Sequence, residues 1–109
     1  MPSYPAGMSW ADKYRYAGED WADKESAAAL LEDLKSSVLS QRAAALGDMA
    51  VNRAEQIVKM GQDWQDYIRE MITARKAANI AKIELEALKM QFNEEQSKQA
   101  NLRAEMRLS

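Results

Sequence analysis

Apolar side chains recur at alternating spacings of three and four residues from Trp64 almost to the end of the chain, a pattern typical of a long helix that packs against other helices. With Trp64 at position a of a heptad, the a positions are Trp64, Met71, Ala78, Leu85, Phe92, Gln99 and Met106. The d positions are Tyr67, Ala74, Ala81, Leu88, Glu95 and Leu102. Because no Pro or Gly follows Gly61, the pattern predicts one unbroken helix over about residues 63–107.

That helix is too long to be enclosed by its own chain. At 1.5 Å per residue it would extend for roughly 65 Å, whereas a compact domain of this size has a radius of gyration of only about 13 Å. It therefore needs other helices beside it, from this chain or from a second one.

The first half of the chain is predicted to contain two helices. Ser9 is a suitable N-cap for a short helix over about 9–17, which would end at Gly18. Asp20 can cap an amphipathic helix over about 20–46, whose apolar positions follow a helical period.

A short connecting helix is expected between the two long ones, over about 52–60. Asn52 and Glu55 have the spacing of a capping box at its start, and Gly61 would end it. Asp63 can then serve as the N-cap of the long C-terminal helix.

These elements predict an all-α fold with a single helical domain over residues 8–109 and a flexible tail over 1–7. The two long helices form an antiparallel helical hairpin with short helices at one end and a coiled-coil-like C-terminal helix. A helix over 20–46 spans about 40 Å, so it would cover the long helix from Trp64 to about Met90 and leave the remainder projecting.

A projecting apolar seam is an association surface rather than a tolerated one, because large exposed apolar patches mark interaction sites. The predicted oligomer seam consists of Leu85, Leu88, Phe92, Leu102 and Met106. We therefore expect a homodimer or a higher helical oligomer.

Composition argues against catalysis and against metal or cofactor binding. The 109-residue chain contains no Cys and no His, and it has neither a Gly-rich phosphate loop nor a strand-turn-helix nucleophile motif. Asp63, Asp66 and Glu70 share a helix face, but helical metal sites of this kind add His ligands, and compensation of the helix dipole explains these carboxylates better. We predict a protein that is not an enzyme and has no cofactor.

A row of basic residues follows position e of the same heptad. It consists of Arg75, Lys82, Lys89 and Arg103, spaced so that it could follow a phosphate backbone or an acidic protein surface. Glu25 and Glu32, also seven residues apart, could instead pair with this row inside the hairpin. The row is thus a candidate site for a partner or for nucleic acid, with structural ion pairs as the alternative.

The aromatic residues are expected to cluster at one end of the bundle, where they would fix the N-terminal helix to the start of the long helix. The expected cluster consists of Trp10, Tyr14, Tyr16, Trp21, Trp64 and Tyr67.

Four stretches of the sequence resemble small helical proteins encoded by tailed phages and prophages. They are residues 63–68 (DWQDYI), 74–82 (ARKAANIAK), 85–92 (LEALKMQF) and 103–108 (RAEMRL), and the resemblance covers about residues 22–108. The genes of such proteins tend to lie among phage recombination and replication functions, and the family has no catalytic motif.

No apolar run approaches the ~18 residues of a membrane span. We therefore expect no membrane contact and a location in the cytoplasm of a bacterial host cell.

Two functions follow from this resemblance and from the helical pattern. The first is a non-enzymatic phage accessory protein that acts by protein–protein contact in DNA recombination or replication, with possible weak DNA contact through the basic row. The alternative is a stoichiometric inhibitor of a host defence or repair complex, such as a CRISPR effector or an exonuclease.

Overall fold

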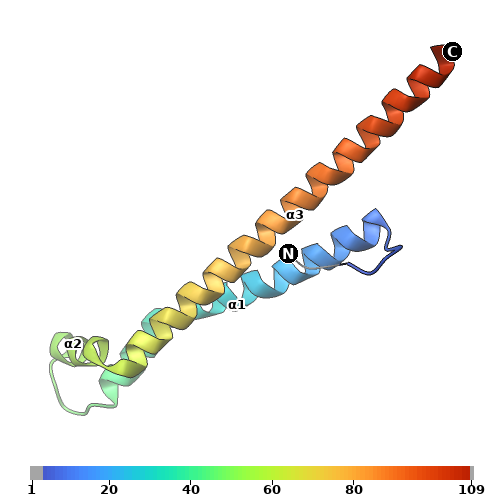
Figure 1. The fold of residues 1–109 in the computed structure, drawn as a ribbon. Helices are drawn as coiled ribbons and strands as arrows, with labels where there is room; N and C mark the ends of the chain where they lie inside the picture. Colours follow the sequence, from blue (N-terminus) through green and yellow to red (C-terminus); the bar gives the residue numbers. More distant parts are fainter. Residues whose placement is uncertain (1–3, 109) are drawn as a thin grey trace.

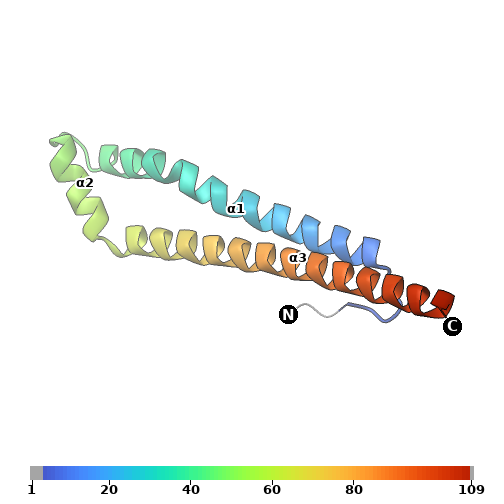
Figure 2. The ribbon, with the colours of Figure 1, turned by 90° about the horizontal axis from the view of Figure 1, so that it is seen from above.

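A computed structural model describes residues 4–108, which form three α-helices and contain no strand. Helix α1 spans Trp10–Ala44, α2 spans Val51–Met60 and α3 spans Gln62–Leu108. Helices α1 and α3 run antiparallel side by side, with α2 across the end where the chain reverses (Figure 1, Figure 2). The molecule measures 85 × 23 × 17 Å. The predicted all-α hairpin with a long C-terminal helix is confirmed.

The predicted break at Gly18 is wrong, because residues 9–17 and 20–46 do not form separate helices. One helix of 35 residues runs through Gly18. A glycine inside a helix costs only about 1 kcal/mol, and the packing of neighbours such as Ala17, which is buried, outweighs that cost. Asp20 is not a cap but lies within α1, where its carboxylate accepts a 3.0 Å hydrogen bond from the Lys24 ammonium. The predicted N-cap is confirmed, because Ser9 Oγ accepts a hydrogen bond from the Asp12 N–H.

The connection between the long helices also differs in detail from the expectation. Helix α2 begins at Val51, and no side chain caps it, so Asn52 lies inside the helix and the predicted capping box does not form. Gly61 ends α2 as predicted. Helix α3 starts immediately afterwards at Gln62, which places Asp63 in its first turn rather than before it. Gly47 supplies the positive φ of 94° that the reversal after α1 requires.

Alanine supplies most of the buried positions of the two long helices. Ala28 of α1 and Ala78 of α3 are completely buried, and no large side chain is buried to that extent among the described residues. The buried positions, which include two larger side chains, are Ala17, Ala28, Ala43, Ala54, Trp64, Ala78, Ala81 and Leu88. Small side chains let the two backbones approach closely, so the hairpin is held by a narrow, shallow seam rather than by a thick core.

The aromatic residues do not form one cluster, and this prediction is wrong. Trp64 and Tyr67 stack with ring centroids 5.7 Å apart at the α2 end of the hairpin, where the Tyr67 hydroxyl donates a hydrogen bond to the Leu31 carbonyl. Trp10 lies at the opposite end, against Phe92. Phe92 and Trp64 are 28 residues apart on α3, so the two aromatic groups are separated by roughly 40 Å along the hairpin.

The start of α1 determines where α3 becomes unaccompanied. Because α1 extends to Trp10, it covers α3 as far as Phe92, not only as far as Met90. The remaining residues, 93–108, continue beyond α1 and are here called the projecting segment (Figure 1). At 1.5 Å per residue this segment is about 24 Å long.

The described part of the N-terminal tail lies against the hairpin. Tyr4 meets Tyr16 edge to face at 6.0 Å, and the Lys13 ammonium lies 5.9 Å from its ring centroid. Burial raises the pKa of the Tyr4 phenol, and the nearby charge of Glu84 raises it further. The flexible-tail prediction for residues 1–7 also covers residues 1–3, which lie outside the described residues.

Candidate functional site

Arg75 of the basic row is taken up by ion pairs inside the hairpin. Its Nη1 lies 2.6 Å from Glu25 Oε2, and its Nη2 and Nε donate to the two carboxylate oxygens of Glu32 at 2.6 and 2.9 Å. The hydrogen bond from Arg75 holds the pKa of Glu32 below its ordinary value. A guanidinium that bridges two carboxylates on the facing helix fixes the register of α1 against α3. For Arg75, the structural alternative is therefore the one observed.

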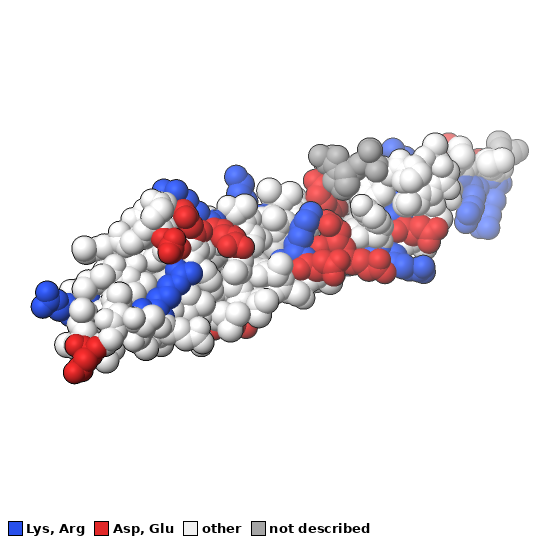
Figure 3. All heavy atoms as spheres, turned by 90° about the horizontal axis from the view of Figure 1, so that it is seen from below, with Lys and Arg blue, Asp and Glu red and all other residues white. Residues whose placement is uncertain are grey.

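The other three basic residues of the row lie apart from Arg75 and from one another. Lys82, Lys89 and Arg103 are exposed, and no ion pair to them is found over residues 4–108. On the face drawn in Figure 3, Lys and Arg form separate groups interrupted by Asp and Glu. Successive members of the row are at least seven residues, about 10 Å, apart along α3, and Arg103 belongs to the projecting segment.

The predicted oligomer seam is divided by the start of α1. Leu88 is buried and Leu85 is half-buried within the hairpin of a single chain. Phe92 lies at the boundary, 38% exposed, and Leu102 and Met106 are 57% and 69% exposed. The outer part of the seam is thus the part that a second protein can reach.

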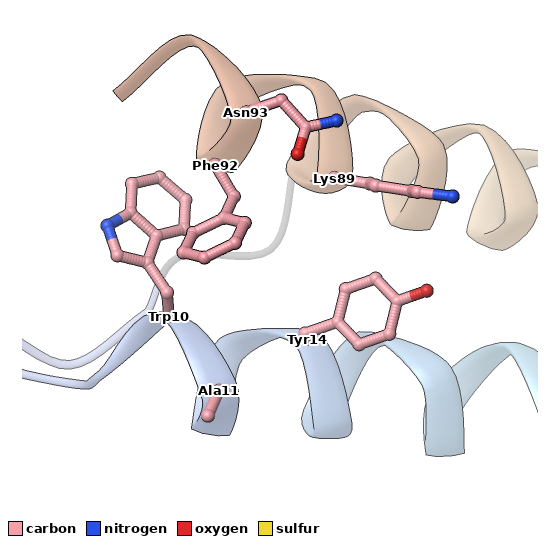
Figure 4. Close-up of a pocket in the computed structure, with 6 residues that line it drawn as sticks. All are labelled: Trp10, Ala11, Tyr14, Lys89, Phe92 and Asn93. Atoms are coloured by element: carbon pink, nitrogen blue, oxygen red, sulfur yellow. The ribbon is translucent and has the colours of Figure 1, made fainter. Parts of the chain in front are cut away.

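Trp10 and Phe92 form the wall of an open cavity at that boundary. Their ring centroids are 5.9 Å apart, and the Lys13 ammonium lies 4.7 Å from the Trp10 ring centroid. The cavity holds about 460 Å³ and is lined by Trp10, Ala11, Tyr14, Lys89, Phe92 and Asn93. Figure 4 shows the side chains of Trp10 and Tyr14 extending from α1 toward α3, with Lys89, Phe92 and Asn93 opposite. The lining is mostly apolar, and the cavity opens where the projecting segment begins.

This cavity was not predicted from the sequence. With Trp10 in a separate short helix, no residue of the first half of the chain was expected to face Phe92. The available signal was the helical spacing of Trp10, Tyr14, Ala17 and Trp21, which continues without interruption through Gly18.

A second exposed apolar row lies on the outer face of α3, directed away from α1. Ile72, Ile80, Ile83 and Met90 are 60%, 49%, 62% and 60% exposed. Their spacing places them within one helical stripe opposite the a and d positions. The a and d positions of the heptad describe only the buried side of α3, so this exposed face was not predicted from the sequence.

At the other end of the hairpin, Arg42 of α1 packs its guanidinium over the Tyr67 ring at 5.9 Å. Its Nη1 atom is buried and makes no hydrogen bond with any residue of the described chain. This arrangement connects α1 to the aromatic pair of α3 and stabilises the end at which the chain reverses.

Other kinds of site are not found in the described part of the chain. Over residues 4–108, no group of three or more His, Cys, Asp or Glu side chains is arranged to hold a metal ion. No helix within the same range combines the length and the apolar character that crossing a lipid bilayer requires.

Comparisons with known proteins give no match: no family model, no curated protein and no solved structure is similar to this chain. The candidate site therefore rests on geometry, and it consists of the projecting segment together with the cavity at its base.

Proposed function

We propose that this protein acts without catalysis, by contact between its projecting segment and another protein. The observation that carries the proposal is the exposure of Leu102 and Leu108, which are 57% and 89% exposed on a part of α3 that no other helix of the described residues 4–108 accompanies. Isolated helices of this length are marginally stable in water, because most helix stability in proteins comes from packing of an apolar face. A partner helix would supply that packing.

The proposed setting is DNA recombination or replication in a phage-infected bacterial cell. Its support is the resemblance of residues 63–68, 74–82, 85–92 and 103–108 to small helical phage proteins. The net charge of −2 and the separation of the basic residues favour protein contact over autonomous DNA binding. Lys82, Lys89 and Arg103 would add at most a weak DNA contact, since Arg75 is occupied by Glu25 and Glu32.

Site-specific photo-crosslinking in the host cell tests this proposal. A photoreactive amino acid at Leu102 is compared with the same amino acid at Leu30, a leucine of α1 that is equally exposed, 58% against 57%. We expect Leu102 to give crosslinks to a recombination or replication protein that Leu30 does not give. Identical products from both positions, or no product from Leu102, would contradict the proposal. A host nuclease or CRISPR effector as the product would favour the inhibitor alternative.

Direct DNA binding is tested separately by gel shift at two salt concentrations. Binding through phosphate contacts weakens steeply as salt rises. We expect little DNA binding at physiological salt. The triple variant Lys82→Gln, Lys89→Gln, Arg103→Gln, which removes three positive charges, should retain the Leu102 crosslinks.

A further inference from the structure

We propose that the outer row of α3, which consists of Ile72, Ile80, Ile83 and Met90, binds the outer row of a second copy of this chain in antiparallel orientation. This inference goes beyond the proposed function, because the outer row lies opposite the a and d positions and leaves Leu102 available to a different protein. The result is a dimer with a twofold axis across the middle of α3.

The outer row has the spacing of a helix-pairing seam. Positions c and f of the heptad alternate every three and four residues, as a and d do on the buried side. From residue 80 to residue 90, these positions hold Ile80, Ile83, Ala87 and Met90. Within residues 4–108, α1 packs on the other side of α3 and no helix covers this one (Figure 2). A helix with the same spacing can therefore pack along it.

The charges along this seam favour an antiparallel pair. Arg69 and Lys76 occupy position f before the isoleucines, whereas Glu86 flanks the seam at b and Glu94 continues it at c. All four side chains are exposed. Arg69 lies 4.0 Å from Asp66 on its own helix, and the other three make no ion pair over residues 4–108. A parallel pair would place like charges together, whereas an antiparallel pair brings the basic end of one copy to the acidic end of the other.

The heptad limits the possible registers, because antiparallel helices place each c position of one copy opposite an f position of the other. One register puts Ile80 opposite Ile83 of the second copy, and the twofold axis passes between them. Four isoleucine side chains then meet at the centre of the dimer, and Met90 lies opposite Thr73 farther out. This register buries the most exposed part of the outer row, where Ile83 is 62% and Met90 60% exposed.

The same register pairs opposite charges on both sides of the isoleucines. Arg69 lies opposite Glu94 of the second copy. Lys76 lies opposite the small side chain of Ala87, so its ammonium can reach Glu86 one residue away. By symmetry each dimer contains two pairs of each kind.

The two neighbouring registers lose these features. A shift that places Ile80 opposite Met90 brings Glu84 and Glu86 within about 3 Å, along the axis, of the same residues in the second copy. The opposite shift places Ile80 against Lys76 and separates the isoleucines. Charge and apolar packing thus select the same register.

Charge reversal with sedimentation equilibrium tests the pairing in the full chain. Lys76→Glu replaces two attractive pairs with repulsive ones, and we expect the dimer Kd to rise about tenfold. Glu86→Lys should have a similar effect, and the combined variant should return the Kd to within about threefold of the original. The matched control Lys35→Glu, which changes the net charge equally at an exposed position of α1, should leave the Kd unchanged. A combined variant that binds as weakly as either single variant, or a wild-type monomer at high micromolar concentration, would overturn the inference.

Disulfide formation tests the orientation directly, because the natural chain contains no cysteine. Arg69→Cys and Glu94→Cys lie 25 residues, about 37 Å, apart on one helix. After mild oxidation of a mixture of the two single variants, we expect a disulfide that joins one variant to the other, and none when either variant is alone. Disulfides within the single-variant samples would show a parallel pair and overturn the inference, as would the absence of any disulfide in the mixture.

Small-angle scattering separates this dimer from association through the projecting segments. The axis between Ile80 and Ile83 lies near the middle of the 85 Å molecule, so the proposed dimer is about 90 Å long. Two molecules that overlap only along their projecting segments would measure about 145 Å and would overturn the inference. The Leu102 crosslinks report the proposed function separately, because the outer-row dimer leaves that side chain exposed.

Discussion

The close approach of α1 and α3 predicts that enlarging one buried alanine will destabilise the hairpin strongly. Ala78 is completely buried, as is Ala28 on the facing helix. Ala78→Leu adds three carbon atoms at a position that solvent does not reach, so we expect the helices to separate locally. Overpacking of this kind costs about 1–3 kcal/mol.

We expect the upper half of that range, because two neighbouring contacts depend on the same spacing. The Arg75 Nη1–Glu25 Oε2 distance is 2.6 Å, and the Tyr67 hydroxyl bonds the Leu31 carbonyl across the same interface. A cost of about 2–3 kcal/mol lowers the melting temperature of a domain of this size by roughly 10–20 °C.

The assay is thermal unfolding followed by far-ultraviolet circular dichroism, at one protein concentration because any association would change the apparent stability. The matched control is Ala100→Leu, the same change at an exposed position of the same helix, which should alter stability by less than about 0.5 kcal/mol. If Ala78→Leu melts at the temperature of Ala100→Leu or above it, the two helices are not held together by a tight alanine seam.

Three further predictions concern single positions. Arg75→Gln should lower the melting temperature more than Lys82→Gln, because only Arg75 bridges carboxylates of the other helix, and equal effects would contradict this role. The difference in melting temperature between these two variants should shrink in acid, because the pKa of Glu32 is lowered in the folded state. The contribution of Glu32 to stability is therefore present above its ordinary pKa of 4.5 and is lost as pH falls through the lowered pKa. Unfolding curves measured from pH 7 to pH 3 would detect this loss. Gly18→Ala should stabilise the protein by about 0.5–1 kcal/mol, because an added Cβ meets nothing within 4 Å. Gly47→Ala should destabilise it, because the φ of Gly47 is 94°. Urea unfolding of both variants checks this, and a Gly47→Ala variant more stable than Gly18→Ala would contradict it.

The heptad of the second half predicted the buried face of α3 correctly. The a and d positions from Trp64 to Leu88 are all buried or half-buried, and Ala78, Ala81 and Leu88 are among the least exposed residues. The pattern succeeds because burial on a long helix depends on a period that the sequence states directly. The pairing of Arg75 with Glu25 and Glu32 was also predictable from the sequence, because the two glutamates are seven residues apart and the basic row has the same spacing.

The first half of the chain was less predictable, because the local sequence around Gly18 indicates a helix end, whereas tertiary packing determines that the helix continues. Gly18 and Asp20 together have the appearance of a helix end followed by a cap. The same residues remain helical because α3 provides a continuous surface for α1 to pack against, and one interior glycine costs less than that surface provides. The capping-box spacing at Asn52 failed for a similar reason, since the short loop after Gly47 already fixes where α2 begins.

The incorrect prediction of a helix end at Gly18 concerns only a few residues, but it changes which residues of the candidate site are accessible. If a break at Gly18 had separated Trp10 from the hairpin, Phe92 would have been an exposed seam residue and no cavity would exist at its side. Because α1 continues, Phe92 is covered by Trp10, the accessible seam starts at the projecting segment, and the base of that segment is an apolar cavity. The a and d positions of α3 change from apolar to polar at this boundary, with Glu95 and Gln99 between Phe92 and Leu102. The accessible surface of the long helix is therefore set by the length of the helix that faces it, and a change in the length of α1 would move the association surface along α3 without changing any residue of α3.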